Sequence, residues 1–329
     1  MSFTLLRSAA CRRATTTFTR RFATAPEPSK SPNWGIYLSG AGALGLGAYA
    51  YLSYGSNASA AAKPVQEKSP LDPNSFINFK LKKVVPYNDN TSTFIFELPD
   101  NQASLLPVAS CVVVKSADPE ALVGDNGKPV IRPYTPISQP DTPGELSFLV
   151  KKYPTGKASV HIHNLKPGEE LAIKGPIIKF EYKANEFENV GLIGGGSGIT
   201  PLYQVLTHAL ADKGNKTKFT LLFANVAEKD ILLREEFDEL AKKFSETFKV
   251  VYYLDKAEKN WTGETGYIGK DAIKKYIAGP EAGNKVKVFV CGPPGQVASI
   301  AGKKAGMKQG ELAGVLKELG YTEEQVFKF

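Results

Sequence analysis

Short runs of strand-forming residues dominate the chain between residues 76 and 182. Apolar, aromatic and β-branched residues concentrate in four runs, at residues 76–81, 93–98, 112–114 and 146–150. Turn-forming residues cluster between the runs, at residues 86–90, 124–127 and 166–169. Several short strands within about 100 residues predict a small antiparallel barrel.

Near residue 190 the pattern changes to buried strands that alternate with helices. Residues 190–193 form a continuous apolar run, and a helical stretch over residues 201–211 follows it. Further elements are predicted as strands at 219–223, 249–254 and 286–290, and as a helix at 231–244. This alternation is typical of a parallel, doubly wound sheet. We therefore predict a barrel over residues 71–182 and a nucleotide-binding sheet over residues 183–329.

The first 70 residues differ in composition from the rest of the chain. Residues 1–30 contain five arginines and many Ser, Thr and Ala, which is typical of a mitochondrial transit peptide. Residues 33–54 carry no charge and are long enough to cross a bilayer, which requires about 20 apolar residues. Residues 55–70 are rich in Gly, Ser, Ala, Lys and Pro, which predicts a linker. A flexible basic tail is the alternative for the first segment.

Composition excludes two classes of function. The net charge is +8, and residues 1–30 hold six basic side chains and one acid, so only +3 remains for the rest. No basic patch for nucleic acid is therefore indicated. The cysteines, Cys11, Cys111 and Cys291, lie too far apart in sequence for a zinc motif or a disulfide framework. We expect no metal site, and we expect His161 and His163 on one face of a strand.

Residues 132–136, Arg-Pro-Tyr-Thr-Pro, combine a cation, an aromatic ring and a hydroxyl on a restricted backbone. On an extended segment Arg132, Tyr134 and Pro136 share one face. Prolines favour the edge of a sheet, where a ligand can approach. These groups suit a ligand that carries both phosphate and a planar aromatic system, as flavin nucleotides do. An exposed turn with a surface arginine is the alternative.

Two further segments have the composition of phosphate sites. Residues 194–201, Gly-Gly-Gly-Ser-Gly-Ile-Thr-Pro, lie between a predicted strand and a predicted helix. Glycines there allow a backbone to approach a pyrophosphate, and the helix start offers unpaired amides. The spacing differs from the G-x-G-x-x-G of dehydrogenases. Gly156, Lys157, Ala158 and Ser159 offer amides, an ammonium and a hydroxyl at a second predicted helix start. A plain glycine turn and a capped short helix are the alternatives.

Two residues end predicted strands of the second domain. Cys291 follows the strand at 286–290, and ligands bind at such carboxyl ends in open α/β sheets. No histidine lies nearby in sequence to activate a thiolate, so we expect a positioning role or a buried inert thiol. Asp255 follows the strand at 249–254, where a carboxylate can approach a ribose and repel a 2′-phosphate. Asp255 therefore predicts a preference for NADH over NADPH.

In this order the motifs resemble those of the NADH–cytochrome b5 reductase family, within the ferredoxin-reductase-like flavoenzymes. The resemblance extends from residue 76 to residue 329 and includes the segments 222–225, 228–234 and 326–329. Together with the N-terminal segments it is closest to the fungal mitochondrial form. This chain departs from the family pattern at Ser197, where threonine is common, and at Gly295 and Gln296, where a proline and a methionine are common.

The resemblance implies an enzyme that binds FAD and NADH and passes electrons to cytochrome b5. It implies FAD contacts for Arg132, Pro133, Tyr134, Thr135, Leu149, Lys151, Gly156, Lys157, Ala158, Ser159 and Thr200. It implies NADH contacts for Gly195, Gly196, Ser197, Gly198, Asp255, Cys291, Gly292 and Pro293. The predicted catalytic residues are Cys291, Lys151 and Thr200.

We further expect a monomer that is anchored to the mitochondrial outer membrane through residues 33–54, with a processed form in the intermembrane space. Two alternatives remain for the function. One is an NADH-dependent flavin reductase of the same fold with another one-electron acceptor. The other is a flavin-binding module without turnover.

Overall fold

The computed structural model describes residues 68–329. The predicted transit peptide, the predicted membrane segment and most of the predicted linker lie outside the described residues. Within residues 68–329, no helix is both long and apolar enough to cross a bilayer. The membrane anchor therefore stays a prediction from sequence.

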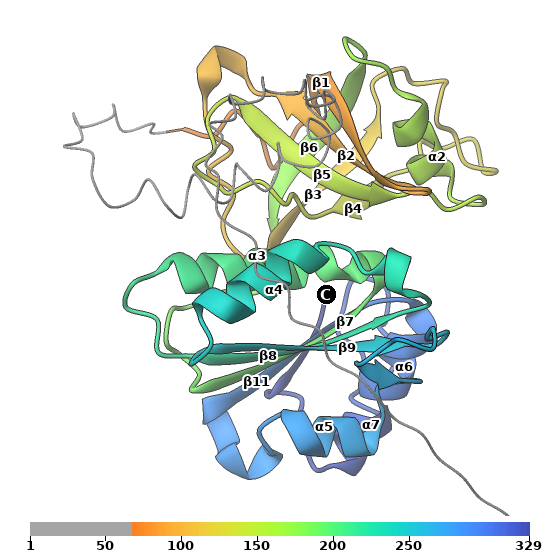
Figure 1. Cartoon of the computed structure of the whole chain (residues 1–329). Helices are drawn as coiled ribbons and strands as arrows, with labels where there is room; N and C mark the ends of the chain where they lie inside the picture. The colour runs from red at the N-terminus through yellow and green to blue at the C-terminus, as the bar shows by residue number, and fades with distance from the viewer. Residues whose placement is uncertain (1–67) are drawn as a thin grey trace, which may run out of the picture. The chain divides into compact units, whose positions relative to one another are not determined.

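The first half of the described chain forms a six-stranded antiparallel sheet in the order β4-β3-β6-β1-β2-β5 (Figure 1). Its strands are β1 (Ile77–Asn88), β2 (Thr91–Glu97), β3 (Ser110–Ser116), β4 (Arg132–Tyr134), β5 (Glu145–Lys151) and β6 (Glu170–Ile178). The amide of Ile137, just after β4, donates to the carbonyl oxygen of Ser147 in β5 at 2.8 Å. This bond draws the two edge strands together, so the sheet curls into the predicted barrel. The barrel is accompanied by a short turn, η1 (Pro99–Asn101), and by helix α2 (Lys157–Asn164).

Alternating apolar side chains fill the barrel. Phe94, Phe96 and Phe148 are buried in one cluster with Leu81 and Ile173, from neighbouring strands. The rings of Phe96 and Phe148 pack edge to face, with their centroids 5.8 Å apart. Aromatic pairs of this geometry add to the stabilisation from burial.

Two sequence expectations in the barrel were wrong. Residues 86–88 do not begin a turn, because β1 continues to Asn88 and Pro86 pairs with Ser92 next to an irregularity in the register. A proline is tolerated where the ladder is already interrupted. His161 and His163 lie in α2, not on a strand. Residues two apart on a helix point in different directions, so these histidines do not share a face.

The second half forms a parallel sheet in the order β10-β9-β8-β7-β11-β12. Its strands are β7 (Asn189–Gly195), β8 (Lys218–Asn225), β9 (Phe248–Leu254), β10 (Glu264–Thr265), β11 (Val286–Cys291) and β12 (Val326–Lys328). Its helices are α3 (Ile199–Ala211), α4 (Arg234–Lys243), α5 (Lys270–Tyr276), α6 (Pro294–Ala301) and α7 (Gly314–Glu318). Three short turns, η2 (Gly196–Gly198), η3 (Glu228–Asp230) and η4 (Pro280–Lys285), complete it. Helices α3 and α4 cover one face of the sheet, and α5, α6 and α7 cover the other (Figure 1). The predicted doubly wound sheet is therefore confirmed.

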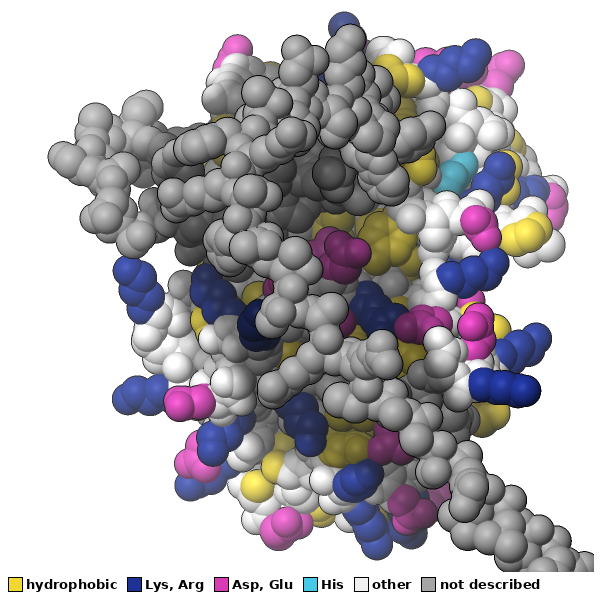
Figure 2. Space-filling model, viewed as in Figure 1, with side chains coloured by type: hydrophobic (Ala, Val, Ile, Leu, Met, Phe, Trp, Pro, Cys, Tyr) yellow, Lys and Arg dark blue, Asp and Glu magenta, His cyan; other side chains and the backbone are white. Residues whose placement is uncertain are grey.

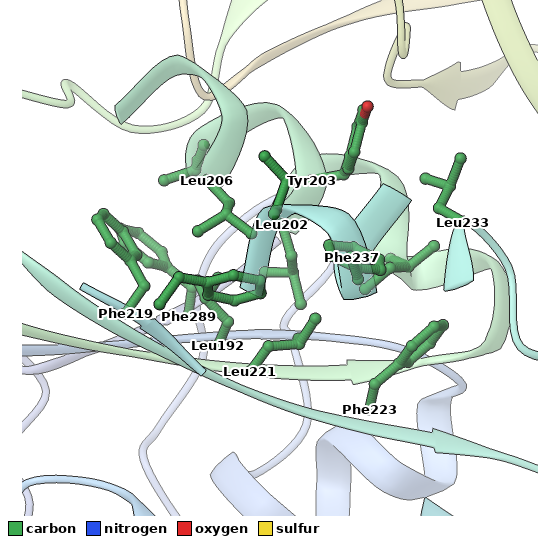
Figure 3. Packing of buried hydrophobic residues seen from close by; sticks show 14 of the residues in the cluster. Leu192, Leu202, Tyr203, Leu206, Phe219, Leu221, Phe223, Leu233, Phe237 and Phe289 are labelled. Carbon is green, nitrogen blue, oxygen red and sulfur yellow. The ribbon is translucent and has the colours of Figure 1, made fainter. Parts of the chain in front are cut away.

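The core under α3 and α4 consists of leucine and phenylalanine side chains (Figure 3). Leu202 and Leu206 of α3 and Phe237 of α4 pack against Leu221 and Phe223 of β8. All five side chains are fully buried. Burial of each such side chain contributes about 1.5–3 kcal/mol, which fixes both helices on this face.

Helix α4 begins later than the sequence indicates. The predicted start at residue 231 was wrong, because Leu233 has φ 56° and the helix begins at Arg234. Leu233 is nevertheless buried in the same core (Figure 3). Leu233 therefore fits the helical spacing of apolar residues in the sequence, although its backbone is left-handed and it precedes the helix.

Charged side chains of both signs are interspersed on the face of the molecule in Figure 2. Lys and Arg form no separate basic region on this face. This distribution agrees with the small net charge that the sequence leaves to residues 31–329. Barrel and parallel sheet belong to one compact unit of the chain.

Candidate functional site

The order in which the chain adds strands to the parallel sheet reverses between β7 and β11. From β7 the chain continues through α3 to β8 on one side, whereas β11 lies on the other side of β7. Such a switch point opens a crevice at the carboxyl ends of the strands, where ligands bind. Gly194 of β7 pairs with Cys291 of β11 at this end. The fold thus brings the predicted glycine loop and the predicted Cys291 segment together.

The two segments approach so closely that only glycine fits between them. A Cβ atom on Gly198 would lie 2.6 Å from the backbone nitrogen of Gly292 and 2.7 Å from the carbonyl oxygen of Cys291. A Cβ atom on Gly195 would lie 2.8 Å from Cδ of Pro293. All three distances are shorter than van der Waals contact, so these glycines are required by packing. They are required whether or not a ligand is bound.

Gln296 joins the two segments by a hydrogen bond. Its Nε2 donates to the carbonyl oxygen of Gly194 at 3.0 Å. A methionine, which is common here in the family that the sequence resembles, has no such donor. Gln296 therefore provides a hydrogen bond between the two segments that a methionine could not form.

The glycine loop leads directly into α3. Gly196 has φ 49°, which favours glycine, and the short turn η2 follows before α3 begins at Ile199. Thr200 is buried in the first turn of α3, and Pro201 follows it in that turn, as predicted. In this turn the amide of Ile199 donates to the carbonyl oxygen of Gly196, and Pro201 has no N–H, so the amide of Thr200 is left to bind an anion.

The thiol of Cys291 is in its neutral form at physiological pH. Burial raises the pKa of Cys291 to about 12. A protonated thiol is a weak nucleophile. This agrees with the predicted positioning role and disfavours covalent chemistry at Cys291.

The Arg-Pro-Tyr-Thr-Pro segment begins at the edge strand β4, as the prolines predicted. Arg132 and Tyr134 pair with Val114 and Val112 of β3, so they occupy one face of the strand, whereas Pro136 lies beyond its end. Pro133 is exposed and Thr135 is half-buried.

The two functional side chains of β4 have different surroundings. In the described part of the chain, no carboxylate forms an ion pair with Arg132. Its Nη1 donates only to the neighbouring carbonyl oxygen of Ile131, at 2.8 Å. Burial raises the pKa of Tyr134 to about 12, and its ring meets Phe148 edge to face at 6.2 Å. A fixed aromatic ring thus lies next to a cation that can still accept an anion.

The second predicted phosphate site lies at the start of α2, as expected. The hydroxyl of Ser159 donates to the carbonyl oxygen of Gly156 at 3.0 Å and accepts from the amide of Tyr153 at 3.1 Å. Lys157 forms an exposed ion pair with Asp125 at 2.5 Å, and Ala158 is buried. The hydroxyl of Ser159 is thus engaged by its own loop. The unpaired amides of the first turn are the groups best suited to phosphate.

Lys151 contacts the other domain rather than remaining free. Its Nζ lies 3.0 Å from Oδ1 of Asp230 in η3, and the two side chains are only 18% and 15% exposed. The predicted flavin-lining residue Leu149 is likewise buried in the cluster that contains Ile199 and Tyr203 of α3. The predicted lysine therefore belongs to the junction between barrel and sheet.

Several contacts across this junction were not predicted from sequence, although Ser197 itself was predicted as a site residue. Tyr153 and Ser197 share a hydrogen bond of 2.7 Å between their hydroxyls. Asn88 donates to the carbonyl oxygen of Lys229 at 2.9 Å. Nothing in the local sequence marks these pairs, because their members lie 44 and 141 positions apart.

Asp255 is the first residue after β9 and is exposed. Its amide donates to the carbonyl oxygen of Asn225 at 3.1 Å, which fixes it at the carboxyl edge of the sheet. The order of the strands places two steps, from β9 through β8, between Asp255 and the glycine loop after β7. Asp255 therefore lies on the correct edge for the distal half of a dinucleotide.

A barrel whose edge carries an arginine without an acidic partner in residues 68–329, next to a doubly wound sheet with a glycine loop, is typical of a class of two-domain oxidoreductases that use a flavin and a nicotinamide. Residues 78–182 match the family described as oxidoreductase FAD-binding domain. Residues 192–301 match the family described as oxidoreductase NAD-binding domain. The chain belongs to the NADH-cytochrome b5 reductase family.

Relatives and a solved structure agree with this assignment. NADH-cytochrome b5 reductase 2 of Mycosarcoma maydis is 47% identical over 94% of this chain and 93% of its own length. NADH-cytochrome b5 reductase 2 of Botryotinia fuckeliana (strain B05.10) is 43% identical over 94% of this chain and 95% of its own. The cytochrome b5 reductase domain of Ulva prolifera nitrate reductase superposes with a TM-score of 0.68 at 26% identity, over 80% of this chain and all of that domain. The predicted family is confirmed.

Proposed function

We propose that this chain transfers electrons from NADH through FAD to cytochrome b5. The observation that carries the proposal is the contact between the glycine loop and the Cys291 segment, in a chain of this family. Gly198 and Gly292 touch at the switch point of the parallel sheet. The relatives named NADH-cytochrome b5 reductase 2 support the same donor and acceptor.

The barrel residues fit FAD. Arg132 has no acidic partner among the described residues and can bind a phosphate through charge-assisted hydrogen bonds. The ring of Tyr134 is fixed by Phe148 beside it, and the start of α2 offers unpaired amides. Bound there, FAD would supply the redox chemistry, since a flavin can take up two electrons and release them one at a time.

The sheet residues position the nicotinamide. The neutral thiol of Cys291 offers a small, weakly polar contact at the end of β11. The packing of Gly195 and Gly198 fixes this contact relative to α3, in whose first turn Thr200 lies. The protein thereby orients the donor, while the cofactors would supply the redox chemistry.

The experiment is steady-state reduction of purified cytochrome b5 by the FAD-loaded full-length chain with NADH. Ferricyanide serves as an acceptor that needs no protein docking. We expect both acceptors to be reduced. Reduction of ferricyanide alone would favour the same-fold reductase with another acceptor, and reduction of neither would overturn the proposal.

We further propose that residues 33–54 anchor the chain as a monomer in the mitochondrial outer membrane, with a processed form in the intermembrane space. Support comes from the arginine-rich residues 1–30 and the uncharged segment that follows them. Fractionation of mitochondria with protease protection tests this location. Recovery only in the cytosol or in the matrix would contradict it.

A further inference from the structure

Asn225, the last residue of β8, has a buried side chain without a protein partner. The residue is 6% exposed, and neither its Nδ2 nor its Oδ1 forms a hydrogen bond within the described part of the chain. A buried carboxamide that leaves both groups unpaired destabilises a fold. Such a group is retained where it binds something other than the protein itself.

Asn225 lies at the ligand-binding edge of the parallel sheet. In the register of the strands, Ala224 pairs with Gly195 of β7, and Asn225 pairs with Leu254 of β9. The side chain therefore stands at the carboxyl end of the strand between the glycine loop and Asp255. In doubly wound sheets, the strand next to the glycine-loop strand ends where the ribose of a dinucleotide is bound.

The face of the sheet on which the Asn225 side chain lies can also be assigned. Phe219, Leu221 and Phe223 alternate along β8 and pack in the core under α3 and α4 (Figure 3). Asn225 follows the same alternation, so it belongs to the face that carries α3. The start of α3, where the amide of Thr200 and the positive end of the helix dipole suit a pyrophosphate, lies on that same face.

The chemistry of the carboxamide selects among the groups of a dinucleotide. A phosphate only accepts hydrogen bonds, so it would leave Oδ1 of Asn225 unpaired. A ribose hydroxyl both donates and accepts, so it can satisfy Oδ1 and Nδ2. We propose that Asn225 binds the ribose hydroxyls of the adenosine half of NADH. This inference rests on the proposed function and adds a second specificity residue beside Asp255.

The test measures the binding of NAD+ and ADP-ribose to the FAD-loaded full-length chain by titration calorimetry. We expect Asn225→Leu to weaken both ligands about tenfold, equivalent to about 1.4 kcal/mol. Nicotinamide mononucleotide, which lacks the adenosine half, should bind the variant and the unchanged chain alike. Thr220→Val, on the same strand but on its other face, is the matched control and should change none of these affinities.

Thermal unfolding without dinucleotide separates binding from a structural role. An apolar side chain of similar size removes the unpaired groups, so Asn225→Leu should leave the unfolding midpoint unchanged or raise it. A clearly lower midpoint would mean that a bound water or a hidden contact holds the amide, and it would overturn the proposal. Unchanged affinity for ADP-ribose would overturn it as well, while NADH oxidation by the same variant would leave the proposed function intact.

A second variant keeps the proposal testable if Asn225→Leu fails to fold. Asn225→Asp keeps the shape and an acceptor for the ribose, but it adds a negative charge. The ratio of the affinity for ADP-ribose to that for its 2′-phosphorylated form should rise about tenfold. An unchanged ratio would overturn the proposal. A chain that binds neither NAD+ nor ADP-ribose before any substitution would instead refute the proposed function.

Discussion

Burial sets the protonation state of the individual groups in this site. The pKa values of Cys291 and Tyr134 both rise to about 12, because the interior disfavours their charged forms. Both groups are therefore neutral across the physiological range. Arg132, which has no acidic partner in residues 68–329, supplies positive charge at the barrel edge. These surroundings suit the proposed roles of Cys291 at the nicotinamide and of Arg132 at a phosphate.

Replacement of Cys291 by serine should slow the reduction of the flavin by NADH while FAD stays bound. The hydroxyl is smaller than the thiol and more polar, so the nicotinamide loses its fitted contact. Stopped-flow absorbance of the flavin measures this rate. The rate in the unchanged chain should show no ionisation of this thiol between about pH 6 and 9, because the pKa lies near 12. Complete loss of reduction with normal NAD+ binding would instead indicate covalent chemistry.

Replacement of Arg132 by alanine should weaken FAD binding. The phosphate loses a charge-assisted partner, which is worth roughly 1.5–3 kcal/mol, or about ten- to 150-fold in affinity. Equilibrium dialysis of FAD measures the loss, and Arg132→Lys should recover part of it. If the alanine variant retained FAD as well as the unchanged chain, Arg132 would be an ordinary surface residue.

Replacement of Asp255 by threonine should raise kcat/KM for NADPH relative to NADH. The exposed carboxylate at the sheet edge repels a 2′-phosphate, and threonine removes that charge. Steady-state kinetics with both coenzymes give the ratio, and FAD affinity serves as the control. An unchanged ratio would mean that Asp255 does not discriminate between the coenzymes.

At the level of elements, the periodicity of apolar residues predicted most core strands. It failed where tertiary packing overrides the local preference of the sequence. Strand β6 was not predicted, because Gly175 and Pro176 interrupt its apolar run. The sheet accommodates them through a β-bulge, in which Gly175 and Pro176 of β6 lie opposite Val112 of β3. The start of α4 was also predicted too early, because Leu233 has a left-handed backbone that its sequence does not reveal. A single sequence does not encode such register shifts in its spacing.

The glycine-loop contact offers a test at this scale. Gly198→Ala places a Cβ against the backbone of Cys291 and Gly292, so the two segments must separate. We expect KM for NADH to rise at least about tenfold, with FAD retained, since about 1.4 kcal/mol suffices for that change. Gly295→Ala in the same segment is the matched control, because no atom lies within 4 Å of its Cβ position. Equal effects of the two substitutions would show that the close approach is unimportant.

At the level of the whole described unit, a small set of polar contacts joins barrel and parallel sheet. The turn η3 provides three of them, through Asp230 to Lys151, through Lys229 to Asp89, and through the Lys229 carbonyl to Asn88. Sequence motifs identified Lys151 as a site residue but gave no indication of its partner. Asp230 lies 79 positions away, and only the packing of the two domains brings them together. The motifs therefore predicted where the cofactors bind but not the contacts that join the two domains.

The two ion pairs of η3 should differ in importance. The pair of Lys151 and Asp230 is largely buried, with 18% and 15% of the side chains exposed, whereas Lys229 and Asp89 are 71% and 79% exposed. Solvent screens the exposed pair, so its contribution is small. Asp230→Asn leaves the ammonium of Lys151 without its charged partner, which costs roughly 1–3 kcal/mol. We expect this loss in the free energy of unfolding, measured by urea titration.

The same substitution should affect electron transfer, because Lys151 and Asp230 fix the barrel relative to the nicotinamide crevice. We expect Asp230→Asn to slow the reduction of the flavin by NADH while the affinity for FAD stays unchanged. Asp89→Asn is the matched control, and it should alter neither the rate nor the stability measurably. If both variants behaved alike, the buried pair would not align the two domains. If Asp230→Asn reduced stability without slowing flavin reduction, the pair would act as a structural tie alone.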